Sequence, residues 1–300
     1  MKKVVVLMST YNGEKYIEEQ IDSILKQRNV NIELIVRDDG SNDKTIDILK
    51  RYNKQGLLKW YCGDNLKPAR SFLDLLKKCP DADYYSFADQ DDFWMEDKLI
   101  SAINILEKEK NNNGKMYFSA TNVVDKYLNH MYKNEINDNV KFESAIIKNQ
   151  ATGCTIVIDD KLRRLINKCE FEYIAMHDSW IYRIALINGA YVYCDNNSYI
   201  KYRQHENNVL GMTNNFFKLC KSRFYRFINS TSESSNTAKE ILRNSKIIKI
   251  DKKELDVLLV LSKYKENFKD KMKLLFSRKC HSKFLIINIL FKIKVLFNKA

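Results

Sequence analysis

The chain has 300 residues, 45% of them hydrophobic and 30% charged, with only 8 Gly and 2 Pro. This composition excludes a disordered chain and predicts one large domain or two modest ones, built from long helices with few linkers. Seven cysteines without a Cys-x-x-Cys pair indicate neither a disulfide framework nor a zinc ribbon, which favours a reducing compartment.

The hydrophobic runs are short. The apolar run at residues 4–8 is too short for a signal peptide, and no run reaches the roughly 18 residues that span a bilayer. We therefore expect a cytoplasmic protein, and its C-terminal residues predict peripheral association with the inner face of the cell membrane.

The formal net charge of +13 is concentrated near the C-terminus. Residues 216–300 hold 21 Lys and Arg against 7 Asp and Glu, whereas residues 1–215 hold 30 and 31. We therefore expect a domain at 1–215 and a basic helical region at 216–300. This asymmetry predicts an anionic partner for the tail alone. Nucleic acid is disfavoured because no stacking platform or binding motif accompanies the basic residues.

The first hundred residues alternate short apolar strands with amphipathic helices. Strands are predicted at 4–7, 32–36, 57–61 and 84–88, and helices at 17–28, 44–52, 72–79 and 99–106. This α/β alternation is typical of a doubly wound, mainly parallel sheet with right-handed connections. The same domain continues less regularly, with strands at 115–120, 154–158 and 191–193 and helices at 159–168 and 179–187.

Ligands of such sheets bind beyond the carboxyl ends of the strands. There the segment ADQDDFW places Asp89, Asp91 and Asp92 directly after an apolar strand. Crowded carboxylates repel one another unless a cation relieves them, and Mg²⁺ or Mn²⁺ would accept these oxygen ligands and still bind a diphosphate. An acidic turn that caps the next helix is the alternative.

The loops after the first two strands suit a nucleotide. Neither Gly-x-Gly-x-x-Gly nor a P-loop occurs, which disfavours a dinucleotide site. Tyr11 offers an aromatic face for a base, and Asp39 could accept a hydrogen bond from a pyrimidine N–H. Taken alone, residues 38–41 favour a helix cap and turn over a binding role.

Three segments, STYNGEKYIEEQIDSILKQ, VRDDGSNDKT and ADQDDFWMEDKL, together resemble the family-2 glycosyltransferases of the GT-A fold. The resemblance is close over residues 3–110 and is greatest to the rhamnosyltransferase-like branch that builds bacterial surface polysaccharides. It implies an Asp-x-Asp metal pair, Asp89 and Asp91, with Asp92 and Trp94 as substrate contacts. The expected nucleotide contacts are Ser9, Thr10, Tyr11, Asp39 and Arg70.

Two later segments also resemble this family. NQATGCTIVI at 149–158 is similar to its acceptor side, and MHDSWIYRIAL at 176–186 is similar to the segment with the catalytic base, for which Asp178 is the candidate. A carboxylate there could take the proton of an acceptor hydroxyl in one inverting displacement. His177 and Trp180 are candidate substrate contacts, and a helix cap with a packed Trp is the alternative.

The segment KYRQHENNVLG at 201–211 suggests a loop that closes the site. His205 is a candidate ligand of the metal or the diphosphate, and Arg203 a candidate phosphate partner. Residues 283–300 mix large apolar side chains with lysines. As a helix they extend on the order of 22 Å, less than the roughly 30 Å hydrocarbon core. They suit the surface of an anionic leaflet, and a helix packed on the domain or a homodimer contact is the alternative.

The sequence therefore predicts a metal-dependent inverting glycosyltransferase. Its donor would be a UDP- or dTDP-sugar, with rhamnose among the sugars considered, and its acceptor a polysaccharide or a lipid-linked oligosaccharide. A nucleotidyltransferase that uses the same crevice is the alternative enzyme, although its glycine and lysine signature is missing. A non-catalytic protein that binds nucleotide-sugars or membranes is the alternative outside enzymes.

Overall fold

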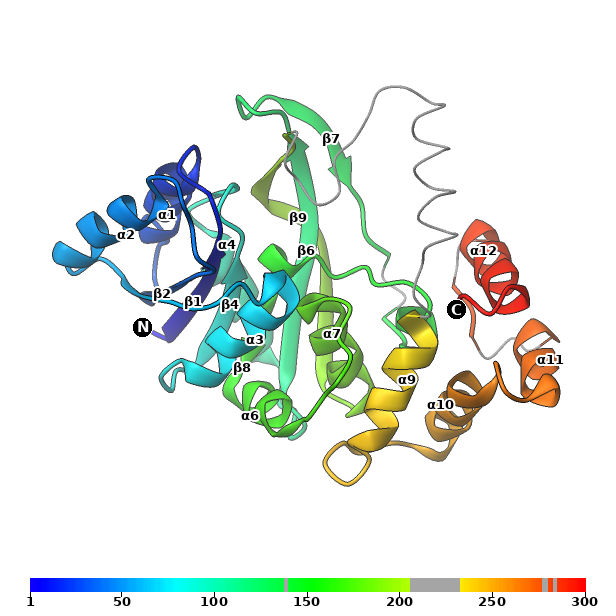
Figure 1. The fold of residues 1–300 in the computed structure, drawn as a ribbon. Coiled ribbons are helices and arrows are strands. Elements are labelled where there is room, and N and C mark those ends of the chain that lie inside the picture. Colours follow the sequence, from blue (N-terminus) through cyan, green and yellow to red (C-terminus); the bar gives the residue numbers. More distant parts are fainter. Residues whose placement is uncertain (138–139, 206–232, 277–279, 283–284) are drawn as a thin grey trace.

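The computed structural model describes residues 1–137, 140–205, 233–276, 280–282 and 285–300 (Figure 1). Within these residues nine strands form one mixed sheet in the order β3-β2-β1-β4-β8-β6-β9-β5, and β7 pairs with β6. The strands are β1 Lys3–Thr10, β2 Asn31–Asp38, β3 Lys59–Cys62, β4 Tyr84–Ala88, β5 Phe93–Trp94, β6 Lys115–Val124, β7 His130–Asn134, β8 Val157–Asp159 and β9 Tyr191–Arg203.

Helices cover both faces of the sheet. They are α1 Ile17–Leu25, α2 Thr45–Lys54, α3 Lys67–Lys78, α4 Lys98–Lys108, α5 Phe142–Ala145, α6 Asp160–Lys168, α7 His177–Ile187, α9 Glu233–Arg243, α10 Lys252–Lys263, α11 Phe268–Phe276 and α12 Leu285–Leu296, with a 3-10 turn η1 at Gly153–Thr155. None of the described helices is both long enough and apolar enough to span a membrane.

The side chains of β1 point alternately to the two faces of the sheet, which explains why the core has two layers. Val4 and Val6 pack with α1, α2 and α4 on one face, whereas Val5 and Leu7 pack with α3, α6 and α7 on the other. A strand that is buried on both faces reads as a continuous apolar run, as the sequence indicated. Strands β3, β2, β1 and β4 are parallel, and β8 runs antiparallel to β4 and β6.

Several elements differ from their predicted bounds. The third strand begins at Lys59 because Leu57 N still donates to Tyr52 O at the end of α2. The strand predicted at 154–158 is reduced to β8, since η1 occupies its first residues. The strand predicted at 191–193 extends to Arg203, because β9 pairs with β6 along its whole length around a bulge near Ser119.

The C-terminal helices continue the body of the protein. Ala238 and Ile241 of α9 and Leu258 of α10 belong to the same core cluster as α3 and α7. The boundary that we predicted between residues 215 and 216 lies outside the described residues. Helices α11 and α12 lie side by side at the edge of the molecule farthest from α1 and α2 (Figure 1).

Candidate active site

A cavity of about 800 Å³ opens beyond the carboxyl ends of β1, β2 and β4. This is where ligands bind in open α/β sheets. Residues of η1 and of the first turn of α7 also line it, with Glu233 of α9 beside them. Eight of the predicted site residues line it: Ser9, Thr10, Tyr11, Asp39, Asp89, Asp91, His177 and Asp178.

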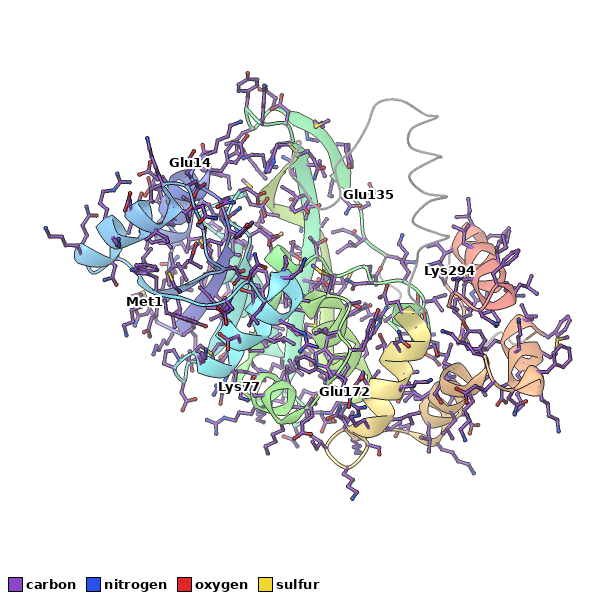
Figure 2. All side chains as sticks on the ribbon, in the orientation of Figure 1. Met1, Glu14, Lys77, Glu135, Glu172 and Lys294 are labelled. Carbon is purple, nitrogen blue, oxygen red and sulfur yellow. The ribbon has the colours of Figure 1, made fainter. Side chains whose placement is uncertain are left out.

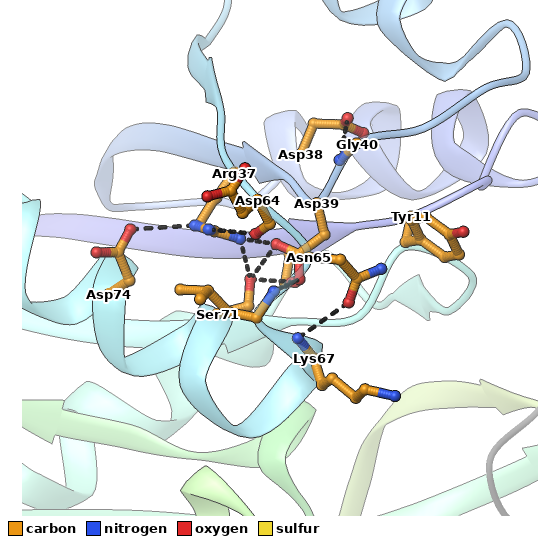
Figure 3. Close-up of polar contacts among 12 residues, drawn as sticks. Tyr11, Arg37, Asp38, Asp39, Gly40, Asp64, Asn65, Lys67, Ser71 and Asp74 are labelled. Atoms are coloured by element: carbon orange, nitrogen blue, oxygen red, sulfur yellow. Dashed lines mark hydrogen bonds and ion pairs between the residues drawn. The ribbon is translucent and has the colours of Figure 1, made fainter.

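A buried arginine, Arg37, fixes Asp39 where it lines the cavity at the end of β2 (Figure 3). The guanidinium of Arg37, which is 3% exposed, pairs with Asp39 and donates from Nε to Asp74 Oδ2 at 3.1 Å. Asp39 also accepts hydrogen bonds from Ser71 Oγ at 2.9 Å and Leu66 N at 3.1 Å. A buried carboxylate is costly without such partners. Asp39 is therefore held as a negatively charged acceptor on the cavity wall.

Gln90, which the sequence analysis did not single out, joins the loops after β1 and β4. Its Oε1 accepts from Tyr11 N at 2.9 Å and its Nε2 donates to Tyr11 O at 3.1 Å. A Cβ on Gly13 would lie 2.3 Å from Gln90 Oε1, so a larger residue there would displace the Gln90 amide from Tyr11. The ring of Tyr11 remains 47% exposed, which leaves its face available to a base.

In the acidic loop after β4, Asp89 and Asp91 line the cavity, whereas Asp92 lies in the core. Asp91 Oδ2 lies 2.8 Å from His205 Nε2 on the cavity side. Burial, together with the charges of Asp91 and Asp178, raises the pKa of Asp89 to about 7. Asp92 is fully buried behind them, where its Oδ1 accepts from Arg203 N at 3.1 Å. Its Oδ2 has no hydrogen-bond partner within the part of the chain that the structure describes.

The charge of the cavity favours a divalent cation. Among the described residues, its walls carry six carboxylates and two lysines. A nucleoside diphosphate would be repelled there unless a cation intervened. Asp89, Asp91 and His205 offer carboxylate oxygens and one imidazole nitrogen, a donor set that fits Mg²⁺ or Mn²⁺. A second group behind it, Asp89, Asp92 and the Cys154 thiol, has its ligand atoms within 4.8 Å of one another.

Asp178 lies in the first turn of α7 and lines the same cavity as Asp39. Its carboxylate accepts hydrogen bonds from Ser179 N and from the Asn149 side chain. Burial raises the pKa of Asp178 to about 6, and the nearby Glu233 adds to this rise. Near neutral pH this carboxylate is therefore unprotonated but weakly solvated, which suits a general base.

His177 is a neutral side chain in the same turn. Its ring centroid lies 4.1 Å from that of Phe72 and 5.4 Å from that of Phe87, and burial lowers the pKa of His177 to about 3. Neither ring nitrogen has a hydrogen-bond partner among the described residues. A Cβ on Gly153 would lie 2.6 Å from His177 Nε2, so a glycine in η1 makes room for the ring.

The other predicted contacts do not line the cavity. Trp94 is packed in the core under Lys98, whose Nζ lies 3.5 Å from the ring centroid, and Trp180 is packed near Phe171. Arg70 lies over the Phe171 ring and donates to Glu172 O at 2.7 Å, outside the cavity wall. These contacts depend on tertiary packing that the local motifs do not reveal.

The segment predicted as a closing loop is partly strand. Arg203 ends β9 and is 2% exposed, with its guanidinium bound to protein groups and outside the cavity wall. His205 follows it and reaches Asp91 from the side of Tyr16. Residues 206–211 of this segment lie outside the described residues.

Comparisons of the sequence with known proteins agree on one family. The model described as "Glycosyl transferase family 2" matches residues 5–160. The chain is 31% identical over 247 residues to the dTDP-rhamnosyl transferase RfbG of Shigella flexneri, which covers 73% of this chain and 81% of that protein. It is 28% identical over 257 residues to WfaP of Escherichia coli, a UDP-Glc:alpha-D-GlcNAc-diphosphoundecaprenol beta-1,3-glucosyltransferase, covering 83% and 86%.

Solved structures share the fold. TarS 1-349 of S. aureus in complex with UDP matches with a TM-score of 0.56 and 17% identity, over 98% of this chain and 90% of that chain. A longer TarS structure is covered over 46% of its length. The mannosyltransferase PcManGT of Pyrobaculum calidifontis, in complex with GDP-Man and Mn²⁺, matches with a TM-score of 0.51 and 14% identity, over 99% and 88%.

Proposed function

The chain belongs to glycosyl transferase family 2, and from this premise we propose that it is a metal-dependent inverting enzyme of bacterial surface polysaccharide synthesis. The GT-A fold and the family that the sequence resembled are confirmed. Family membership disfavours the nucleotidyltransferase and the non-catalytic alternatives. One observation carries the proposal: Asp39, the candidate nucleotide contact, Asp91, the candidate metal ligand, and Asp178, the candidate base, all line one cavity.

The donor is a nucleoside diphosphate sugar, with dTDP-rhamnose as the first candidate and UDP-glucose as the second. The rhamnosyl relative in Shigella and the glucosyl relative in Escherichia support these two. Tyr11 stacks on the base, and Asp39 accepts a hydrogen bond from its N–H. Ser9 and Thr10, the last two residues of β1, line the cavity beside Tyr11 and are the further nucleotide contacts that we propose.

The acceptor is a glycan or a lipid-linked oligosaccharide. Asp178 takes the proton of its hydroxyl while the hydroxyl oxygen bonds to the anomeric carbon. The bond from that carbon to the diphosphate oxygen breaks in the same step, and the nucleoside diphosphate leaves with the electron pair. Attack from the face opposite the leaving group inverts the anomeric centre.

Asp89 and Asp91 would hold a divalent cation, with His205 as the third ligand. When bound, Mg²⁺ or Mn²⁺ supplies the positive charge that stabilises the departing diphosphate. The Mn²⁺ in the mannosyltransferase complex supports this assignment, as do the crowded carboxylates of the cavity. His177 stays neutral and offers a sugar hydroxyl a ring nitrogen that has no hydrogen-bond partner in the described part of the chain.

A donor screen tests the proposal. Thermal unfolding is followed with dTDP-rhamnose, UDP-glucose and the free nucleotides, each with Mg²⁺, with Mn²⁺ and with EDTA. A bound donor raises the midpoint by mass action, so we expect stabilisation by at least one donor that EDTA abolishes. If neither donor nor its nucleotide shifts the midpoint with either cation, the proposed function is wrong.

A further inference from the structure

Helix α12 is apolar on its exposed side as well as its buried side. Phe291 and Val295 pack against the protein. The opposite side presents Leu285, Ile286, Ile289, Leu290 and Leu296, which are 48–73% exposed. An exposed apolar side of this extent on a helix ordinarily has a partner that covers it.

Helix α11 and the chain end extend this exposed region. Phe268 and Phe276 of α11 are 77% and 78% exposed, and Phe297 after α12 is 67% exposed. The two helices pack on each other at the edge of the molecule, and Figure 2 shows their side chains projecting from that edge, with Lys294 labelled on α12. We call these eight side chains of α11, α12 and Phe297 the apolar edge.

Positive charge surrounds the apolar edge. Within residues 265–276 and 285–300, which the structure describes, there are seven Lys and two acidic residues. Large apolar side chains beside lysines suit an anionic bilayer, where the former enter the acyl boundary and the latter meet the headgroups. The same charge opposes a second copy of this chain, because two such surfaces would repel each other.

A pair of hydrogen bonds joins this edge to the cavity. Asn288, on the buried side of α12, accepts from Ser282 N at 2.7 Å and donates to Ser282 O at 2.8 Å. Ser282 lines the same cavity as Asn149 and Gln150 of the predicted acceptor segment, which we call its acceptor side. A bilayer that binds α12 would therefore lie close to the acceptor side of the cavity.

From this arrangement we infer that the apolar edge docks on an anionic lipid bilayer and turns the acceptor side of the cavity toward the headgroups. The binding surface stands independently of catalysis. Its use, to present a lipid-linked acceptor, rests on the proposed function.

Vesicle binding by the full chain tests the inference. The vesicles contain phosphatidylcholine alone or with phosphatidylglycerol, and no donor or acceptor, so failure here is distinct from failure of the glycosyltransferase proposal. We compare the unaltered chain with a triple variant of the apolar edge, Phe276→Ser, Ile286→Ser and Leu290→Ser. The matched control, Leu57→Ser, Tyr127→Ser and Met131→Ser, removes three exposed apolar side chains elsewhere.

We expect salt-sensitive binding to the anionic vesicles, with a roughly tenfold or greater loss in the edge variant and little change in the control. Circular dichroism and donor binding establish that the edge variant is folded. Absence of vesicle binding by the unaltered chain overturns the inference, and so does equal binding by a folded edge variant. A dimer that forms without vesicles and dissociates in the edge variant also overturns it, in favour of a second copy.

Discussion

The guanidinium Nε of Arg203 donates to the backbone carbonyl of Asp91 at 2.7 Å, which joins the end of β9 to the acidic loop after β4. The same guanidinium donates to Lys126 O at 2.7 Å, pairs with Glu19 and lies 4.5 Å from the ring centroid of Tyr16. Arg203 was predicted as a phosphate partner. In the structure it instead positions the loop that carries Asp91.

Replacement of Arg203 by Met should therefore weaken both stability and metal-dependent donor binding. Buried carbonyls and a partly buried carboxylate would lose their donor, at a cost of roughly 3 kcal/mol of unfolding free energy. Urea unfolding and donor calorimetry with Mn²⁺ measure the two effects. Arg70→Met is the control, since Arg70 is exposed and outside the cavity. Equal stability of the two variants would contradict the positioning role of Arg203.

Two carboxylates, Asp39 and Asp74, pair with Arg37. Replacing each one in turn should distinguish an effect on nucleotide binding from an effect on folding. Asp39 lines the cavity, whereas Asp74 contacts the other end of the guanidinium and also Tyr61 and Lys78. Asp39→Asn should weaken donor binding roughly tenfold or more, because a charge-assisted hydrogen bond to the base is lost. Asp74→Asn should bind the donor nearly as well as the unaltered chain. Calorimetry on both decides, and equal losses would show that Asp39 acts only through Arg37.

Much of the first half could be predicted from local sequence. The run at residues 4–7 predicted a strand buried on both faces, and the positions of Ser9, Asp39 and Asp89 after predicted strands indicated that they lie together, as they do in the wall of one cavity. Both predictions depend on features that short stretches of sequence carry. These are the apolar pattern within a strand and the common edge at which parallel strands end.

The rest depends on contacts between distant residues. The two-residue strand β5 carries no periodicity, and it forms because Trp94 pairs with Ile200. Glu233 reaches the cavity from α9, and nothing in its own segment resembles a site. Arg203 and Glu19 are 184 residues apart, so no local motif could distinguish a positioning arginine from a phosphate ligand.

Removal of the candidate metal ligands should abolish cation-dependent binding of the donor. Asp91→Asn and His205→Ala each remove one partner of the 2.8 Å contact between these side chains. We expect calorimetry with Mn²⁺ to show donor binding reduced in both variants to the level that EDTA leaves. Asp64→Asn serves as the control because this exposed carboxylate lies outside the cavity. Full Mn²⁺-dependent binding by Asp91→Asn would refute the metal assignment.

The pH profile of transfer should report Asp178. A general base works in its unprotonated form, and burial raises the pKa of Asp178 to about 6. At saturating donor, the rate should fall roughly tenfold per pH unit below that value and level off above it. Asp178→Asn should lower the rate by about 10²–10⁴-fold and leave donor binding intact. A variant that turns over at the unaltered rate would exclude Asp178 as the base.

The same substitution should stabilise the folded protein at alkaline pH. The pKa of Asp178 is raised above its unfolded value of about 3.9, so the stabilising protonated form is fully present below that pH and is lost as the pH rises through 6. Asp178→Asn should gain about 1–3 kcal/mol of unfolding free energy at pH 8 and almost nothing at pH 4. Asp47→Asn, at an exposed position on α2, should show no such difference. A pH-independent effect of Asp178→Asn would mean that lost packing, and not relief of a buried charge, determines its stability.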